Sequence, residues 1–350
     1  MNMIPTVRSV KGNFQKSHQP RPSRQRPVQL LSFFLLLPTL TLNSSCNLGR
    51  NLASVTDNTI PRLASPLADA DFKGLTERLK QFTEVSALRS SRVLLQFLDA
   101  QSAERFRQAD AILVLQRPDK IRLVIQVPVT GTKLADMVSE ANRFKLALYP
   151  RQYRRFLIGT TDADYSRMRE KLGKEEQQSA LLNARPFHFT NALLVNPLHQ
   201  GDARFTYSLE EALVREPDTS KGAKKGAQLL RSFYVISEIE AATPAGAPAR
   251  VRRRFWFDRT QQARFARQQI FDNRGLVATE VEYSNYVKLS EKSEELWPGV
   301  ILVSRPRDNY SAKLTFTPGS FEVNPDLSEA RPFVLENAER LPETDLDKQP

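Results

Sequence analysis

The stretch between residues 250 and 317 constrains the fold most strongly, because apolar and polar side chains alternate along it with a period of two. Between Val277 and Tyr283, for example, Val, Thr and Tyr alternate with Ala and Glu. This period directs one set of side chains to one face of a strand and the other set to the opposite face. The expected strands are Val251–Asp258, Ala263–Phe271, Val277–Tyr286, Val300–Arg305 and Tyr310–Thr317.

A turn signal separates two of these strands. Asp272-Asn273-Arg274-Gly275 consists of turn-forming residues and ends in a glycine that can adopt a positive φ. The strands on either side are therefore expected to form a hairpin. Because no helical pattern interrupts the series, the strands should pair in order as an antiparallel meander. Nothing in this stretch carries a catalytic signature.

The chain before residue 250 is also rich in strand patterns, and short helical patterns accompany them. Turn residues occur at Arg117-Pro118-Asp119 and at Val129-Thr130-Gly131. The expected strands are Arg92–Leu98, Ala109–Arg117, Lys120–Val127, Arg143–Pro150, Gln152–Gly159, Asp202–Arg215 and Gln228–Ala241. The expected helices are Phe72–Phe82, Asp164–Leu172 and Lys174–Leu182, and Asn183–Pro197 is expected to form a helix or a helical turn. The sequence therefore predicts a mainly β fold of the α+β class, with a large antiparallel sheet and a few short helices.

Composition is that of a folded globular protein, and the sequence lacks catalytic patterns. Of the 350 residues, 40% are hydrophobic and 9% are aromatic. The histidines are His18, His188 and His199, and the spacing of the last two matches no metal-ligand motif. There is no Gly-x-Ser-x-Gly elbow, no phosphate-binding loop and no Cys-His pair. We therefore expect a protein that is not an enzyme, with no cofactor and no metal, and with surface or hydrogen-bonded histidines.

The N-terminal segment has the pattern of an export signal. Basic residues end at Arg26, and an apolar core follows between Val28 and Leu42. This core is too short to cross a bilayer comfortably and contains Pro38, which favours a signal peptide at residues 1–45 over a membrane anchor. The formal net charge is +12, and the six basic residues of this segment, with no acidic ones, supply half of it.

The single cysteine, Cys46, directly follows this core and Ser44-Ser45. The arrangement resembles a bacterial lipoprotein cleavage site, where the cysteine is lipidated and becomes the mature N-terminus. Such sites favour Leu three residues before the cysteine, whereas Leu42 lies four before it. The alternative is an ordinary secretory signal with an incidental cysteine. The expected organisation is a signal peptide at 1–45, a flexible tether at 46–71, a folded domain at 72–335 with insertions near 216–226 and 242–249, and an acidic tail at 336–350 that frays.

A basic and aromatic run occupies Arg250–Phe257. A strand would direct Arg252 and Arg254 to one face and Arg253 to the other. We interpret the run as a solvated edge of the sheet, attractive to anionic lipid head groups or an acidic partner, and not as a nucleic-acid platform. Trp297 is interpreted as a packed end of the sheet, with an exposed binding aromatic as the alternative.

Two groups of residues carry a family resemblance. The first is Arg117-Pro118-Asp119-Lys120-Ile121-Arg122-Leu123, followed by Val138–Ala141 and Phe144-Lys145-Leu146-Ala147-Leu148-Tyr149-Pro150. The second is Trp297-Pro298-Gly299-Val300-Ile301-Leu302, then Ser304-Arg305-Pro306, Leu314-Thr315-Phe316 and Val323-Asn324-Pro325-Asp326-Leu327 before Phe333. These runs resemble the LolA/LolB-like lipoprotein carriers and receptors, and the resemblance covers most of residues 72–335.

The resemblance implies an incomplete, strongly curved β-barrel whose concave apolar face is covered by short helices and accepts acyl chains. Such a protein needs a dry concave surface and a way to open. Candidates for that surface are Leu113, Leu115, Leu123, Ile125, Phe144, Leu146, Phe255, Phe257, Val281, Leu302 and Phe316. The alternative is that these side chains pack as ordinary core. The sequence does not assign the family's lid-closing arginine to a residue, and the two insertions are additional to the family pattern.

Two hypotheses of function follow. The first is a cell-envelope lipoprotein that binds a lipid, an acyl chain or an acylated protein, as a carrier, receptor or chaperone. The second is a structural lipoprotein with a filled core and an envelope protein as partner. In both, we expect export and anchoring to the membrane through Cys46. The resemblance implies the outer membrane, facing the periplasm, because Asn47 in place of Asp would permit transfer there.

Overall fold

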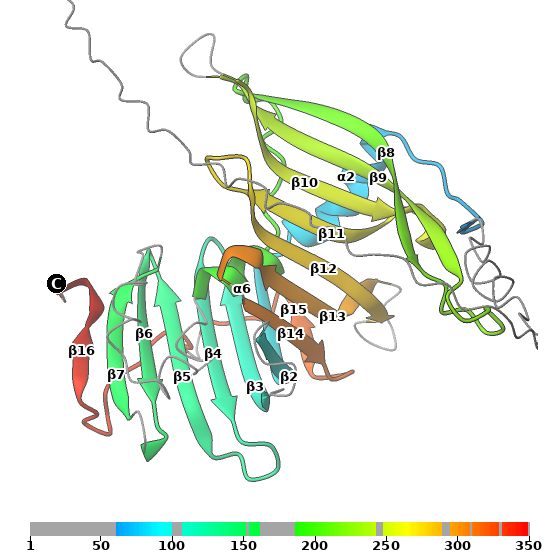
Figure 1. Ribbon diagram of the computed structural model, residues 1–350. Helices are drawn as coiled ribbons and strands as arrows, with labels where there is room; N and C mark the ends of the chain where they lie inside the picture. The colour runs from blue at the N-terminus through cyan, green and yellow to red at the C-terminus, as the bar shows by residue number, and fades with distance from the viewer. Residues whose placement is uncertain are drawn as a thin grey trace, which may run out of the picture. The chain divides into compact units, whose positions relative to one another are not determined.

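One large β-sheet dominates the computed structural model (Figure 1). The structure describes residues 61–99, 107–151, 154–161, 186–242, 248–288, 295–308, 310–328 and 331–348. The predicted signal peptide, Cys46 and the predicted helices at 164–172 and 174–182 lie outside the described residues.

The strands form two series along the chain. The first series is β2 (Ala87–Asp99), β3 (Arg107–Gln116), β4 (Lys120–Gln126), β5 (Lys133–Glu140), β6 (Arg143–Leu148) and β7 (Arg155–Thr160). The second is β8 (Phe205–Pro217), β9 (Gln228–Glu240), β10 (Arg250–Asp258), β11 (Arg264–Phe271), β12 (Val277–Lys288), β13 (Leu296–Arg305) and β14 (Tyr310–Phe316). Three short strands are β1 (Arg62–Leu63), β15 (Phe321–Val323) and β16 (Glu343–Asp345), and the helices are α2 (Phe72–Thr83) and α6 (Pro186–Leu193).

Within each series, consecutive strands pair antiparallel, as the period of two predicts. The pair β14–β2 joins the two series, with Leu314 opposite Leu95. The parallel pairs β1–β9 and β16–β7 make the sheet mixed. No pairing among the described residues joins β8 to β16, so the sheet is open. The predicted fold class is confirmed.

The hairpin between β11 and β12 turns where the sequence predicts it. Gly275 adopts a φ of 76°, which a side chain would disfavour. Asp272 accepts hydrogen bonds from the backbone of Arg274 at 2.8 Å and of Leu276 at 3.0 Å. The side chain of Asp272 thereby closes the turn.

The first helix also begins where the sequence predicts it. Asp71 caps α2, because its Oδ1 accepts a hydrogen bond from the backbone of Gly74 at 2.7 Å. The buried side chains of α2 are Leu75, Leu79 and Phe82. Their spacing of three and four residues places them on one face of the helix, which faces the sheet. α6 is shorter than the predicted helix Asn183–Pro197.

One of the longer strands, β5, is absent from the predicted set, as are the short strands β1, β15 and β16. β5 alternates poorly because residues 135–139 are all buried, on both faces of the sheet. Asp136 lies on the outer face, where it forms a bidentate ion pair with Arg122, at 2.8 and 3.1 Å. A buried carboxylate inside a strand hides the period of two, although its arginine partner on β4 makes it compatible with burial.

The two ends of the described chain lie against the sheet. Within the predicted tether, β1 pairs with β9, and Ala68 donates a backbone hydrogen bond to Arg259 O at 2.9 Å. Residues 331–348, here called the C-terminal strap, cover the outer face of β5–β7. The tail was expected to fray. This expectation is wrong for residues up to 348, because Leu341 and Leu346 are buried and β16 pairs with β7.

Candidate functional site

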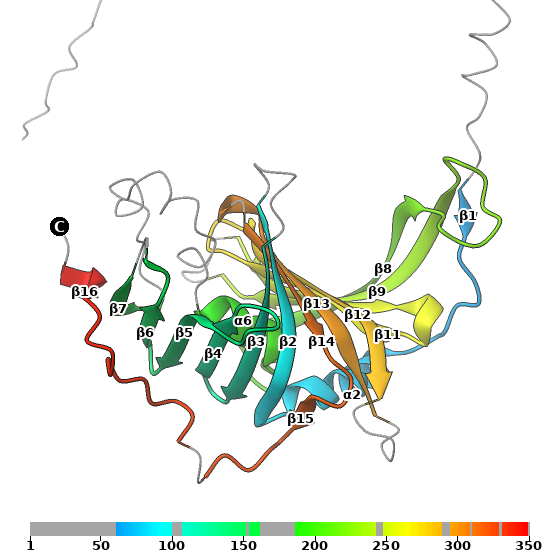
Figure 2. The same ribbon diagram turned by 90° about the horizontal axis from the view of Figure 1, so that it is seen from below.

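The candidate apolar surface is one continuous face of the sheet, and it curves around α2 and α6 (Figure 2). The predicted residues that belong to this single core cluster are Leu113, Leu115, Leu123, Ile125, Phe144, Leu146, Phe255, Phe257, Val281 and Phe316. Leu302 is the exception: it lies on the opposite face of β13 from Ile301 and Val303, which are buried. Its assignment to the surface was wrong, because the neighbouring position, not this one, points inward.

Cross-strand pairs show that this face spans both series. Val281 lies opposite Val303, and Val303 lies opposite Ala312. On the other series, Leu113 lies opposite Leu123, which in turn lies opposite Met137. Since every one of these side chains is less than 5% exposed, the face is covered in this structure.

The cover consists of α2, α6 and the residues that directly follow α6. α2 contributes Leu75, Leu79 and Phe82, and the segment around α6 contributes Phe189, Ala192, Leu193, Leu194 and Val195. Phe82 inserts into a group of rings that we call the aromatic cluster. Its ring centroid lies 5.0 Å from that of Trp297, 5.1 Å from that of Phe265 and 6.0 Å from that of Tyr283. The apolar face is therefore covered by the few side chains that α2 and the segment around α6 contribute.

Trp297 carries an unusual feature in this cluster. The side chain is 3% exposed, and its Nε1 has no hydrogen-bond acceptor in the described part of the chain. A buried donor without an acceptor is unfavourable by about 1–3 kcal/mol. The prediction that Trp297 is a packed end of the sheet is confirmed. Its Nε1 is a buried donor without an acceptor among the described residues, and its ring contacts Phe82 of α2.

A single arginine holds the ends of both covering segments. Arg117 follows β3, and its Nε donates to Val85 O at 2.6 Å. Its Nη2 donates to Phe82 O at 3.2 Å and to Val195 O at 2.7 Å. Its Nη1 donates to Asn196 Oδ1 at 3.2 Å. Arg117 thus contacts the C-terminal end of α2 and the segment that leaves α6.

The electrostatics of Arg117 match these contacts. The C-terminal carbonyls of a helix carry partial negative charge, which favours a cation. Burial lowers the pKa of the Arg117 guanidinium from its ordinary value, but an arginine stays charged at neutral pH. Among the described residues, the hydrogen-bond acceptors of its guanidinium are backbone carbonyls and an amide, and none is a carboxylate.

A second arginine holds the same segment from β10. Arg253 donates through Nη1 to Asn196 O at 2.8 Å and through Nη2 to Pro197 O at 2.7 Å. Its Nε lies 2.6 Å from Glu238 Oε2, and both side chains are buried. The interpretation of this basic run as a solvated edge is wrong at Arg253. The pairing register of β10 against β9 shifts between Val251 and Arg253, and beyond this shift the side chain of Arg253 points toward Glu238.

His199 completes this group. Its backbone nitrogen and its Nδ1 each lie 3.0 Å from Glu238 Oε1, and its ring stacks on Phe205 with centroids 4.4 Å apart. Burial alone would raise the pKa of Glu238, but the hydrogen bonds and charge of Arg253 and the hydrogen bonds of His199 outweigh burial and lower it. The expectation of a hydrogen-bonded histidine is confirmed for His199, whereas the side chain of His188 lies outside the described residues.

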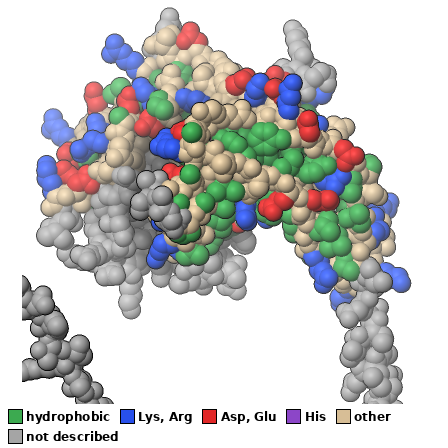
Figure 3. Space-filling model, turned by 90° about the horizontal axis from the view of Figure 1, so that it is seen from above, with side chains coloured by type: hydrophobic (Ala, Val, Ile, Leu, Met, Phe, Trp, Pro, Cys, Tyr) green, Lys and Arg blue, Asp and Glu red, His purple; other side chains and the backbone are tan. Residues whose placement is uncertain are grey.

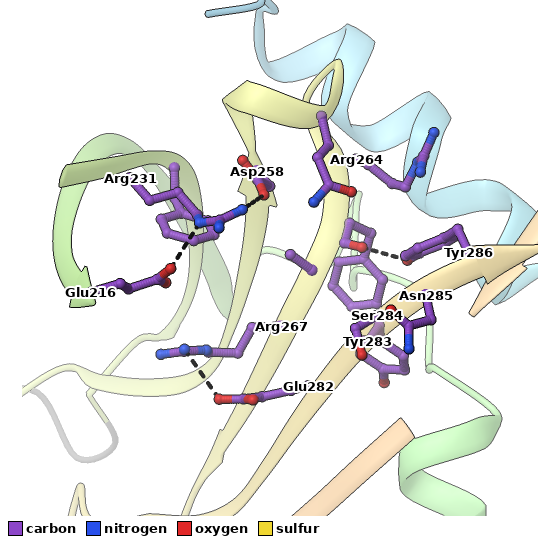
Figure 4. Close-up of a pocket in the computed structure, with 14 residues that line it drawn as sticks. Glu216, Arg231, Asp258, Arg264, Arg267, Glu282, Tyr283, Ser284, Asn285 and Tyr286 are labelled. Atoms are coloured by element: carbon purple, nitrogen blue, oxygen red, sulfur yellow. Dashed lines mark hydrogen bonds and ion pairs between the residues drawn. The ribbon is translucent and has the colours of Figure 1, made fainter. Parts of the chain in front are cut away.

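Three pockets among the described residues have charged side chains in their lining, and one of them also reaches Phe265 and Tyr283 of the apolar face. Figure 4 shows one of about 270 Å³ beside β11 and β12. In it, Arg231 lies between Glu216 and Asp258, at 3.0 and 2.8 Å. Arg267 pairs with Glu282 at 3.1 Å. Most of its charges are therefore compensated. Two other pockets, of about 440 and 340 Å³, are also lined by charged residues.

The described residues hold no group of three or more His, Cys, Asp or Glu side chains placed to bind a metal ion. In the same ranges, no helix combines the length and the apolar character needed to cross a membrane.

The sequence did not identify the arginines that hold the cover. The sequence placed Arg117 at the end of a strand, in a turn and in a run that carries the family resemblance, but gave it no role, because hydrogen bonds from its side chain to distant carbonyls leave no local pattern. One signal was available: Arg117 directly follows a buried strand and precedes Pro118, so its side chain must find partners near the core edge. Glu238 lies in a strand without any signal of its own.

Comparison with known proteins gives similarity at the level of structure only. No family model matches the sequence, and no curated protein matches it significantly. The structure is similar to a LolA superfamily protein from Nitrosomonas europaea, with 8% identity, a TM-score of 0.38, and coverage of 74% of this chain and 96% of that one. It is also similar to a DUF1329 family protein from Desulfovibrio piger, with 13% identity, a TM-score of 0.40, and coverage of 73% and 93%.

A third similar structure is described as an outer membrane lipoprotein-sorting protein domain from Vibrio parahaemolyticus. It has 11% identity, a TM-score of 0.37, and coverage of 73% of this chain and 93% of that one. The resemblance to LolA-like proteins noted in the sequence is thus met again among solved structures. With TM-scores below 0.5, these similarities carry no argument about function, which rests on the geometry described above.

Proposed function

We propose that this protein binds an acyl chain between the apolar face of its sheet and the cover formed by α2 and α6, and that Arg117 holds the cover closed. One observation carries the proposal. The side chain of Arg117 hydrogen-bonds the ends of both covering segments, at Phe82, Val85 and Val195. Release of this one side chain would free the C-terminal end of α2 and leave the segment after α6 held by Arg253 alone. Arg117 takes the role of the lid-closing arginine that the family resemblance implies.

The energetics favour a cover that opens only for an apolar ligand. Lifting α2 exposes three side chains that are at most 2% exposed, namely Leu75, Leu79 and Phe82. At about 1.5–3 kcal/mol for each, this opening is unfavourable by about 5–9 kcal/mol. An acyl chain of fourteen methylenes gains about 11 kcal/mol when it is fully buried. A long acyl chain can therefore replace α2 on the sheet, whereas a short or polar molecule cannot.

The biological setting is proposed from the sequence. An export signal followed by a lipidated Cys46 would place the protein in the cell envelope, on the outer membrane and facing the periplasm. The folded part would then act as a carrier, receptor or chaperone for a lipid or an acylated protein. In this setting the domain needs no catalytic group, because binding and release are the whole reaction.

Native mass spectrometry tests the proposal. The chain from Asn47 onward contains the whole compact unit of residues 58–350. Purified from bacterial cells without detergent, it should carry a lipid or acylated peptide at near-stoichiometric occupancy, identified by extraction. A bare chain that also takes up no fluorescent fatty acid would contradict the proposal.

Substitution of Arg117 tests its role as the closing contact. In Arg117→Leu, the carbonyls of Phe82 and Val195 lose their donor, so the cover should open more often. We expect the rate of uptake of a fluorescent fatty acid to rise at least tenfold, measured by stopped-flow fluorescence. Arg89→Leu, at an exposed position of β2, serves as the control. An unchanged rate in Arg117→Leu would contradict the assigned role.

One observation favours a second function. The apolar face is completely covered, while Leu209 and Leu213 on the edge strand β8 are 40% and 57% exposed. Exposed apolar side chains on an edge strand are typical of surfaces that bind another protein. Figure 3 shows hydrophobic side chains at the surface among charged ones. The alternative is therefore a structural lipoprotein with a filled core that binds an envelope protein, and a bare chain in the mass spectrum would support it.

A further inference from the structure

A gap interrupts the sheet between β11 and β12. The two strands pair from Phe271 opposite Val277 to Arg267 opposite Glu282, and the pairing ends there. Beyond this point, within the described part of the chain, β11 continues to Arg264 paired with β10 alone, and β12 continues to Lys288 paired with β13 alone. The pocket of Figure 4 lies at this gap, because residues from both diverging strands line it.

The cause of the gap lies in β12 and β13. Asn285 adopts a φ of 51°, which interrupts the regular strand. Gly299 on β13 approaches it so closely that a Cβ atom there would lie 2.5 Å from Asn285 O. β12 therefore follows β13 at this point and separates from β11. A glycine at position 299 is required for this close contact.

The inner wall of the gap is continuous with the aromatic cluster. Phe265 and Tyr283 line the pocket, and both rings also contact Phe82, the residue of α2 that would leave when the cover opens. On the outer side, Ser284 and Asn285 are exposed. The gap therefore lies between exposed residues of β12 and two buried rings that also contact Phe82.

One cation at this gap is uncompensated. Arg231 and Arg267 each contact two carboxylates. Arg264, in contrast, forms no ion pair and no hydrogen bond with the described residues. Its guanidinium lies over the ring of Tyr286, 4.8 Å from the centroid. The hydroxyl of Tyr286 donates to Phe265 O across the gap, which keeps the ring in place beneath the arginine.

We propose that this gap is the head-group site of the acyl ligand, and that Arg264 selects chains that end in an anionic group, a carboxylate or a phosphate. The inference rests on the proposed function. The anionic group would lie against Arg264 at the solvent side, where an unpaired guanidinium can form charge-assisted hydrogen bonds. The chain would pass along Phe265 and Tyr283 and take the place of Phe82. A neutral head group carries no charge that could pair with the guanidinium of Arg264.

The test compares three ligands of equal chain length on the chain from Asn47 onward. Palmitate and palmitoyl lysophosphatidate carry anionic heads, and hexadecanol carries a neutral one. By displacement of a fluorescent acyl probe, wild type should bind both anionic ligands at least tenfold more tightly than hexadecanol. Arg264→Gln should lose this preference with unchanged affinity for hexadecanol, and Arg264→Lys should keep most of it. Arg215→Gln, at an exposed position of β8, is the matched control.

The outcomes separate this inference from the function on which it rests. If wild type binds none of the three ligands, the proposed function fails, and this inference with it. If wild type binds all three equally, or if Arg264→Gln keeps the preference, the protein binds acyl chains but the head-group site is wrong. If the preference is present in wild type and lost in Arg264→Gln, the ratio of palmitate to lysophosphatidate affinity distinguishes a carboxylate from a phosphate as the preferred group. Raising the salt concentration should weaken palmitate binding in wild type more than in Arg264→Gln.

Discussion

At the scale of the residue, two arginines determine how the covering segments sit on the sheet. Arg117 and Arg253 come from different strand series, yet both donate to the segment that follows α6, at Asn196 and its neighbours. Arg253 is compensated by the buried carboxylate of Glu238, whereas Arg117 faces carbonyls and an amide. We infer that the contact through Arg253 is the more permanent one, because separating a buried ion pair is unfavourable by several kcal/mol.

The unpaired nitrogen of Trp297 leads to a prediction on stability. In Trp297→Phe the buried Nε1 donor disappears without the loss of a hydrogen bond, while most of the ring stays in the cluster. The smaller ring leaves a small cavity, which opposes the gain. We expect the free energy of unfolding to change by less than about 1 kcal/mol, measured by urea denaturation. Trp256→Phe removes a donor that is bonded to Gln269 at 3.2 Å and serves as the comparison. A loss above about 2 kcal/mol in Trp297→Phe would show that the nitrogen has a partner.

At the scale of the element, the C-terminal strap protects an apolar area on the outer face of the sheet. A second core cluster lies there, made of Val138, Ala147, Phe156, Leu335 and Leu341. Arg122 anchors the strap through Nη1, which donates to Pro332 O at 2.9 Å. The strap therefore belongs to the folded domain, and the tail cannot be removed without exposing the sheet.

Truncating one strap side chain tests this. Leu341→Ala should lower the free energy of unfolding by about 2 kcal/mol, because it removes a buried side chain that contacts β6 and β7. Hydrogen exchange should accelerate in β6, β7 and β16 and stay unchanged in β12 and β13. Val334→Ala in the same strap is the matched control, because Val334 is 54% exposed, and it should change stability by less than about 0.5 kcal/mol. Equal effects of the two variants would contradict the role of the second cluster.

At the scale of the whole molecule, stability should depend on acidity through Glu238. Its pKa is lower in the folded chain than the ordinary 4.5. A carboxylate with a lowered pKa contributes its full stabilisation above the ordinary value and loses it as the pH falls through the lowered one. The molecule should therefore lose stability below about pH 4.5.

Thermal unfolding between pH 7 and pH 3 checks this dependence. Glu238→Gln should melt at a lower temperature than wild type at pH 7, since Arg253 loses its charged partner, and the difference should shrink as the pH falls. Asp326→Asn is the control, because the pKa of Asp326 is also lowered, by hydrogen bonds from Ser328, but at an exposed site. Melting curves of Glu238→Gln that run parallel to wild type at all pH values would contradict the assignment.

The sequence by itself was sufficient to predict most strands of the sheet, the first helix and most residues of the concave face. The alternation in β12 and β14, the turn at Asp272–Gly275 and the cap at Asp71 are local patterns, and each acts over a few residues. The same locality explains the failures. Leu302 was placed on the wrong face because a shift of one residue reverses every side chain of a strand, and β5 was hidden by a buried aspartate.

Only the tertiary structure decided how these elements come together at the candidate site. Arg117 meets Val195 across a separation of 78 residues, and Arg253 meets Asn196 across 57. The gap at Arg264 arises from the contact between Asn285 and Gly299 on two other strands. Hydrogen bonds and ion pairs of this kind depend on distance in space and not along the chain, so no local pattern of residue types records them. The apolar face could be predicted from the sequence. The contacts of Arg117 that hold its cover, and the position of Arg264 that would select the ligand, could not.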